Sequence, residues 1–181
     1  MPLFIAAAHF AAVRHRDQKR KGASDAPYIN HLLEVSHLLS SAGVTDQEVL
    51  AAAVLHDSVE DVGVTFEEIA ERFGDRVAEI VREVTDDDGL PRGVRKRLEV
   101  ERAPSASAGA QAIKVADKLS NVLGMVVSPP AGWTYQRKVD YCLFAKDLVD
   151  HCPQAPESLV AKFHEVLAQV LRTLEKNHSA A

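Results

Sequence analysis

The chain contains 181 residues, a length that fits one folded domain with a buried core. Its hydrophobic fraction of 46% and charged fraction of 26% are typical of a globular protein in water. A net charge of −5 excludes an overall positive field that would attract nucleic acid or a membrane surface, so neither is expected as a partner.

The lengths of the apolar runs and the positions of the cysteines indicate in which cellular compartment the protein is expected. No apolar run approaches the roughly 20 residues that span a bilayer, and the first residues lack the basic start of a secretion signal. Cys142 and Cys152 are ten positions apart on one expected helix, too far along its axis to form a disulfide. We therefore predict free thiols and a cytoplasmic protein.

Helix caps and apolar residues at helical spacing recur along the whole chain, whereas sustained alternation of apolar and polar residues is missing. Thr45 and Thr65 each begin a capping box with a glutamate three positions later. The expected helices cover approximately residues 3–21, 27–43, 46–61, 65–74, 75–84, 92–101, 108–127, 134–151 and 156–177. The sequence therefore predicts a single all-α domain over residues 1–181, a bundle of about eight to ten helices.

Residues 49–61, VLAAAVLHDSVED, join an apolar run to a cluster of groups that can bind a metal or move protons. The apolar run predicts a helix that is buried all round. Continuing that helix at about 100° per residue places four polar side chains on one side: His56, Asp57, Glu60 and Asp61. Neighbouring carboxylates repel one another, and near a helix C-terminus they face the unfavourable end of its dipole, so a cation is expected among them. The alternative is a buried helix that becomes polar as it reaches solvent.

Two further candidate ligands lie on other expected helices. His31 shares a helix face with Val35, which turns its imidazole towards the core, although a histidine there is more often a core residue than a ligand. Asp117 lies in the middle of an apolar helix, where a carboxylate is costly unless it binds a metal or pairs with Lys114 or Lys118. With the His-Asp pair, these residues supply two imidazoles and two carboxylates, a set that favours Mn²⁺ or Fe²⁺ over structural zinc.

The order of these candidate ligands resembles that of the HD metal-dependent phosphohydrolases. Longer stretches are similar to the hydrolase half of the RelA/SpoT alarmone enzymes, and most of all to the stand-alone small alarmone hydrolases, also called metazoan SpoT homologues. These stretches are DQKRKG, PYINHLLEV, AAAVLHDSVEDVGVTFEEI, FGDRVAEIVREVTDD, RKRLEVERAP, IKVADKLSNV and SPPAGWTYQRKVDY. The resemblance covers about Ala7 to Val149 and implies a helical HD-domain bundle.

The resemblance implies a set of metal ligands and a catalytic pair. It implies that Mn²⁺ is bound by His31, His56, Asp57 and Asp117, and that Glu60 and Asp61 are catalytic. Glu60 would orient or deprotonate a water molecule, and Asp61 would assist it or protonate the leaving group. The implied reaction removes the 3′-pyrophosphate of guanosine tetraphosphate or pentaphosphate and gives GDP or GTP plus pyrophosphate.

The resemblance also implies which side chains hold the nucleotide: Arg20, Lys21, Arg92, Asn121 and Tyr141. Arg20 and Lys21 would offset phosphate charge, although taken alone they fit a solvated helix end equally well. Arg92 stands where relatives often carry lysine, and residues 121–124 lack the arginine and acidic residue that relatives often show after the asparagine. Both departures bear on substrate preference.

Two alternatives stay open from the sequence. The same site would serve another nucleotide, such as NADPH losing a 2′-phosphate. A protein that senses nucleotides without catalysis is the other alternative, and the intact Glu60-Asp61 pair argues against it. A small-molecule nucleotide is the expected partner in each case, and assembly into a homo-oligomer is left open.

Overall fold

The computed structural model of the chain describes residues 2–20, 22, 25–87 and 89–179. These residues form ten α-helices and one short 3₁₀ helix: α1 (Leu3–Arg14), α2 (Ile29–Ser41), α3 (Gln47–Leu55), α4 (Ser58–Val62), α5 (Phe66–Phe73), α6 (Asp75–Val84), α7 (Arg92–Arg102), η1 (Ala103–Ser105), α8 (Ala108–Val127), α9 (Tyr135–Asp150) and α10 (Glu157–Ser179). Within this part of the chain there is no strand, and the one isolated bridge pairs Lys19 with Pro27. The predicted all-α fold is confirmed.

Helix α3 forms the centre of one half of the molecule. All seven residues from Val49 to Leu55 are buried, because α1, α2, α6 and α8 pack around this apolar helix. Gly109 allows the start of α8 to come close, since a Cβ atom there would lie 2.9 Å from a methyl group of Val49. The turns that follow α3 are thereby fixed against the core.

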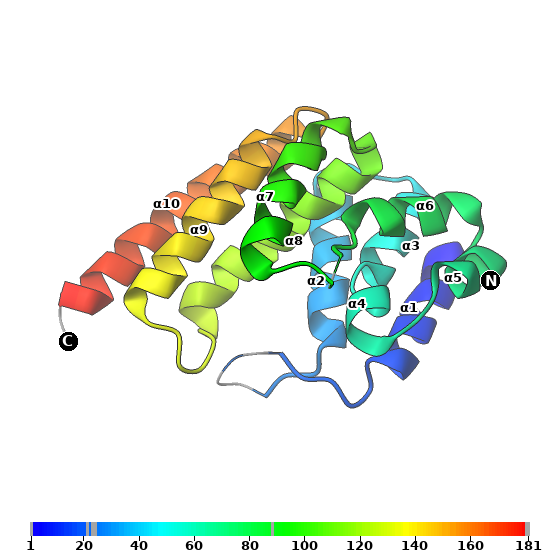
Figure 1. Cartoon of the computed structure of the whole chain (residues 1–181), viewed down its shortest axis with the longest axis horizontal. Helices are drawn as coiled ribbons and strands as arrows, with labels where there is room; N and C mark the ends of the chain where they lie inside the picture. Colours follow the sequence, from blue (N-terminus) through cyan, green and yellow to red (C-terminus); the bar gives the residue numbers. More distant parts are fainter. Residues whose placement is uncertain (1, 21, 23–24, 88, 180–181) are drawn as a thin grey trace.

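Helices α8, α9 and α10 lie side by side in the other half, and α2 joins the two halves (Figure 1). Ile113, Leu119 and Phe163 are fully buried where α8 meets its neighbours. The N-terminus and the C-terminus lie at opposite ends of the long axis (Figure 1). No helix in the described ranges combines the length and the apolar character needed to cross a bilayer.

The first helix is shorter than predicted. It ends at Arg14, and the residues up to Arg20 form a turn and an extended segment paired with residues 26–28. Arg16 and Arg20 would repel one another on a continuous helix, four positions apart. His15 is 1% exposed, and its ring contacts Gln18 and Ser58, so the buried imidazole holds the turn in place.

The predicted continuous helix over residues 46–61 is also wrong. Helix α3 ends at Leu55, His56 and Asp57 form a turn, and α4 begins at Ser58. The acidic pair of α4 therefore lies in a first helical turn, where the dipole favours negative charge, rather than near a helix C-terminus.

One of the two predicted capping boxes is wrong and the other is confirmed. The cap of α3 is Asp46 and not Thr45, because the Asp46 carboxylate accepts the N–H groups of residues 48 and 49. Thr65 caps α5 as predicted, through the Glu68 N–H at 3.1 Å. Helix α6 begins at Asp75. Residues 103–105, between α7 and α8, form η1.

Candidate metal centre and substrate cleft

Three separate elements bring the candidate ligands together. His31 comes from the first turn of α2, His56 and Asp57 from the α3–α4 turn, and Asp117 from the middle of α8. Ligand atoms of His31, His56 and Asp117 all lie within 4.8 Å of one another, a grouping that can hold a metal ion.

The two imidazoles direct the same nitrogen towards the two carboxylates. Asp57 Oδ2 lies 3.0 Å from His56 Nε2 and 3.7 Å from His31 Nε2. Asp117 Oδ1 lies 3.1 Å from His31 Nε2 and 3.8 Å from His56 Nε2. Donor atoms held about 2.1 Å from one ion are separated by about 3.0–3.4 Å, so these spacings fit a common metal.

Hydrogen bonds at the opposite ring nitrogens determine which nitrogen is free. His56 Nδ1 donates to the Ala53 carbonyl oxygen at 2.8 Å. The Ser120 hydroxyl donates to Glu34 Oε2 at 2.7 Å, so its oxygen accepts from His31 Nδ1 at 2.9 Å. Each Nε2 is then left with its lone pair, the state in which histidine binds a metal.

Polar neighbours also fix the two carboxylates. Asp57 stands at the N-cap position of α4 without capping it, and its Oδ2 accepts from the Tyr28 hydroxyl at 2.7 Å. Asp117 accepts from Asn121 Nδ2 at 2.6 Å and from Lys118 Nζ at 3.0 Å. The Lys118 salt bridge that the sequence offered as an alternative is present, and it coexists with the approach of both imidazoles.

The charges at this centre fit a cation. His56 Nε2 is buried and makes no hydrogen bond to any described residue. Burial lowers the pKa of His31, which favours the neutral ring. Burial acts against protonation of His56 too, but the charges of Asp57 and Asp117 outweigh it and raise its pKa well above the ordinary value. Burial likewise opposes ionisation of Asp57, yet the neighbouring imidazoles lower its pKa to about 2. The two carboxylates thus favour a positive charge between the imidazoles, which a divalent ion would supply while leaving each Nε2 unprotonated.

A cleft of about 930 Å³ opens at this centre. His31, Asp57, Glu60 and Asp61 line it, whereas His56 and Asp117 are not part of its lining. Four of the five predicted nucleotide contacts, Arg20, Arg92, Asn121 and Tyr141, also line it. The fifth, Lys21, lies outside the described residues. Residues from the connection between α1 and α2, from α2 and α4, and from α7, α8 and α9 thus face one space.

The predicted catalytic pair is held in place from outside α4. Glu60 Oε1 accepts the backbone N–H of Asp86. Asp61 Oδ2 accepts from Gln18 Nε2 at 2.7 Å. Arg20 is positioned by hydrogen bonds to Asn121 Oδ1 at 3.1 Å and to the Ser120 hydroxyl at 3.3 Å. The two carboxylates predicted to transfer protons and the guanidinium predicted to bind phosphate are therefore held in place around one cleft.

Several residues of this centre were missed by the sequence analysis. Tyr28 and Ser120 form hydrogen bonds with the candidate metal ligands Asp57 and His31, and Gln18 forms one with Asp61. The ring centres of Trp133 and Tyr141 lie 5.8 Å apart in the cleft wall. Ser120 left a usable signal, because a hydroxyl three positions after an aspartate on an apolar helix needs a partner. Tyr28, three positions before His31, left a weaker one.

Comparison with known proteins connects this geometry to a family. A family model described as an HD domain matches residues 7–132. The chain belongs to the HD-domain family. The matched range of this HD-domain protein contains all four candidate ligands and both residues of the catalytic pair, whereas Tyr141 lies beyond it.

Two curated relatives and one solved structure resemble this HD-domain protein over most of its length. The guanosine-3′,5′-bis(diphosphate) 3′-pyrophosphohydrolase MESH1 of Drosophila melanogaster is 43% identical over 92% of this chain and 93% of its own. Its namesake from Homo sapiens is 47% identical over 80% of this chain and 82% of its own. The structure of a metazoan SpoT orthologue described as hydrolysing ppGpp has a TM-score of 0.89 at 42% identity, over 93% of this chain and 96% of that one.

Proposed function

We propose that this HD-domain protein is a Mn²⁺-dependent guanosine-3′,5′-bis(diphosphate) 3′-pyrophosphohydrolase that acts in the cytoplasm. It removes pyrophosphate from the 3′ position of guanosine tetraphosphate or pentaphosphate and gives GDP or GTP. The observation that carries the proposal is the convergence of two imidazoles and two carboxylates at a cleft with arginines in its wall. The relatives that carry this activity in their names span nearly the same length. We propose that residues 1–181 act as one HD-type domain.

The metal would be held by the Nε2 atoms of His31 and His56 and by carboxylate oxygens of Asp57 and Asp117. This mixed nitrogen and oxygen set suits Mn²⁺, because thiolates, which favour structural zinc, are missing from it. A divalent ion bound there polarises a phosphoryl oxygen and makes water more acidic.

Glu60 and Asp61 would move the protons. Glu60 faces the cleft with Oε1 fixed by the Asp86 N–H, and its carboxylate would take a proton from the attacking water. Asp61 is held by Gln18 in the same wall and would return a proton to the departing oxygen. Because the two carboxylates are adjacent on α4, one would accept a proton while the other donates one.

The nucleotide would be bound by the basic and polar side chains of the wall. Arg20 and Arg92 would pair with phosphate oxygens, and Lys21 would join them as the sequence predicts. Asn121 and Tyr141 offer an amide and a hydroxyl for the ribose or the base.

A chromatographic assay tests this proposal. Guanosine tetraphosphate is incubated with the protein and Mn²⁺, and GDP and pyrophosphate are quantified. Asp57→Asn and a chelator are expected to lower the rate by at least about 100-fold. Asp147→Asn, an exposed carboxylate on α9, serves as the matched control and is expected to keep the wild-type rate.

The outcome against the proposal is equally clear. No turnover of the guanosine nucleotide by metal-loaded protein, with NADPH hydrolysed under the same conditions, would overturn the substrate assignment. Turnover of neither nucleotide would point to a sensor.

A further inference from the structure

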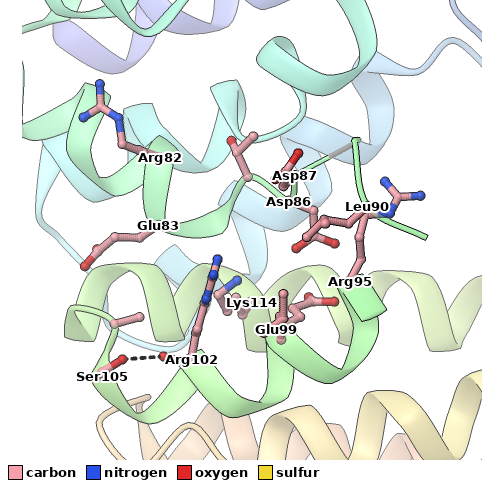
Figure 2. A pocket seen from close by; sticks show the side chains of 13 residues that line it. Arg82, Glu83, Asp86, Asp87, Leu90, Arg95, Glu99, Arg102, Ser105 and Lys114 are labelled. Atoms are coloured by element: carbon pink, nitrogen blue, oxygen red, sulfur yellow. Dashed lines mark hydrogen bonds between the residues drawn. The ribbon is translucent and has the colours of Figure 1, made fainter. Parts of the chain in front are cut away.

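A second pocket lies beside the cleft and shares no lining residue with it. It has a volume of about 240 Å³ and is enclosed by α6, the loop that follows it, α7, η1 and the start of α8. Eight of its thirteen lining residues have charged side chains, and Figure 2 shows these side chains around the pocket. Its chemistry is therefore that of an ion site rather than an apolar pocket.

Lys114 is the decisive residue of this pocket. Its side chain starts from the buried face of α8, is 7% exposed and reaches into the pocket (Figure 2). Among the described residues it has no hydrogen-bond or ion-pair partner. Burial lowers the pKa of its amine, and the charges of Glu99 and Asp86 offset this effect only in part. Because a buried ammonium group is costly unless it is hydrogen-bonded or paired, an anion bound in the pocket would stabilise the charged form of Lys114.

Arg102 supplies a second cation from α7. Its guanidinium lies in the same pocket near Lys114 (Figure 2). It forms no ion pair in the described part of the chain. Arg82 differs, because its guanidinium pairs with Glu79 and lies 4.6 Å from the ring centre of Phe66. Of the four lining cations, Lys114 and Arg102 form no ion pair with a described residue, whereas Arg82 and Arg95 have partners.

Most of the lining carboxylates are already occupied. Glu83 holds the first turn of α8 through Ser107, Asp87 accepts a backbone N–H in its own loop, and Glu99 pairs with Lys118 at 3.0 Å. Asp86 alone among the lining acids has no side-chain partner in the described residues. Burial and the neighbouring Glu99 raise the pKa of Asp86, so this carboxyl group is easier to protonate than an exposed aspartate.

We propose that this pocket is a binding site for a small inorganic anion of the phosphate type, held by Lys114 and Arg102. The volume is below the roughly 300–1,000 Å³ of pockets that enclose larger organic ligands, so inorganic phosphate fits and a whole nucleotide does not. A guanidinium and an ammonium group on one anion give the strong charge-assisted hydrogen bonds that phosphate sites use.

The experiment must separate this site from the catalytic cleft. The two are close, because the Asp86 N–H binds Glu60 while Glu99 and Asp117 share Lys118. Inorganic phosphate also has affinity for a metal-loaded cleft. Variants that disable each site individually therefore decide where the anion binds.

Binding of inorganic phosphate to the full chain with Mn²⁺ bound is measured by isothermal titration calorimetry. Lys114→Met and Arg102→Gln are each expected to weaken one binding component by about tenfold or more, the usual effect of losing a charge-assisted hydrogen bond. Arg82→Gln, in the wall of the same pocket, is the matched control and keeps that component. Arg20→Gln changes the catalytic cleft and is also expected to keep the binding component that belongs to the second pocket.

Three results would overturn the proposal. Phosphate affinity that is the same in wild type, Lys114→Met and Arg102→Gln would show that the pocket does not bind it. Binding lost only in Arg20→Gln would assign it to the cleft. No detectable binding up to millimolar phosphate would rule the site out. None of these results depends on hydrolysis, so the proposed function and this site fail independently.

Discussion

At the scale of single residues, two hydrogen bonds decide which histidine nitrogens can bind a metal. His31 and His56 each use Nδ1 as a donor, to Ser120 and to the Ala53 carbonyl respectively. The bond of His56 is to the backbone and no side-chain substitution removes it directly. The bond of His31 depends on the Ser120 hydroxyl, which Glu34 orients. Ser120 is therefore the residue where the role of these supporting bonds can be tested.

We expect Ser120→Ala to weaken Mn²⁺ binding by about 10–100-fold, because the His31 ring loses the partner that fixes its orientation and tautomer. The affinity is measured by calorimetric titration of Mn²⁺ without nucleotide. Ser36→Ala is the matched control, since Ser36 is equally buried but donates to the Leu32 carbonyl in α2, away from the centre. Equal Mn²⁺ affinity of the two variants would contradict the prediction.

At the scale of elements, the start of α3 is connected to α6 by a charge as well as by apolar packing. Asp46 caps α3 through Oδ1, and its Oδ2 accepts from Arg76 of α6 at 2.6 Å. Arg76 also pairs with Glu48, so one guanidinium bridges two acids in the first turn of α3. This connection steadies the helix that leads into the His56-Asp57 turn.

Asp46→Asn should cost about 0.2–1 kcal/mol of unfolding free energy at neutral pH, because asparagine keeps the cap and removes only an exposed ion pair. The hydrogen bond from Arg76 lowers the pKa of Asp46 below its value of 3.8 in the unfolded chain. The ionised carboxylate therefore stabilises the fold fully above pH 3.8, and this contribution is lost as the pH falls through the lower folded pKa.

Urea unfolding of wild type and Asp46→Asn between pH 7 and pH 3 or below measures this difference. The difference in unfolding free energy between wild type and Asp46→Asn is expected to become smaller at the lowest pH values. In an Arg76→Gln background the narrowing should become smaller, because only the capping N–H groups of residues 48 and 49 then lower the pKa of Asp46, and this background provides the control. A gap that widens as the pH falls would show that the sign is wrong.

At the scale of the whole molecule, the metal centre exists only in the folded chain. Its ligands come from α2, the α3–α4 turn and α8, and 86 positions separate His31 from Asp117. The unfolded chain cannot hold these groups within a few ångströms of one another. A metal that binds only the native state adds its binding free energy to stability.

Mn²⁺ at about 100 times its dissociation constant should stabilise the fold by about 2.7 kcal/mol. For a chain of this size that corresponds to a rise in Tm of about 5–10 °C. Thermal melts with and without Mn²⁺ measure it. His56→Ala is expected to remove the rise, and His164→Ala, an exposed histidine of α10, should keep it. An unchanged Tm in wild type at saturating Mn²⁺ would contradict the prediction.

Much of the fold and of the candidate site was predictable from sequence because local rules control both. The apolar run of Val49–Leu55 predicts a buried helix, and it is one in the structure. Capping by Thr65 depends on neighbours within one turn, so it too was predicted correctly. The HD family was recognisable from residue order alone, and the comparison confirms it. That the four ligands hold a metal remains a prediction.

The tertiary structure decided what depends on partners distant in sequence. The break between α3 and α4 separates Asp57 from the predicted helix face and aims it at His31, a contact across 26 positions. His15 ends the basic helix early because Ser58 and Gln18 enclose its ring. The burial of the Lys114 amine depends on the packing of α6 against α8 and on the pocket lining that α7 contributes, which the sequence does not reveal. The chain by itself determines helices through interactions within a few residues, whereas burial and charge at the two pockets arise when separate helices pack together.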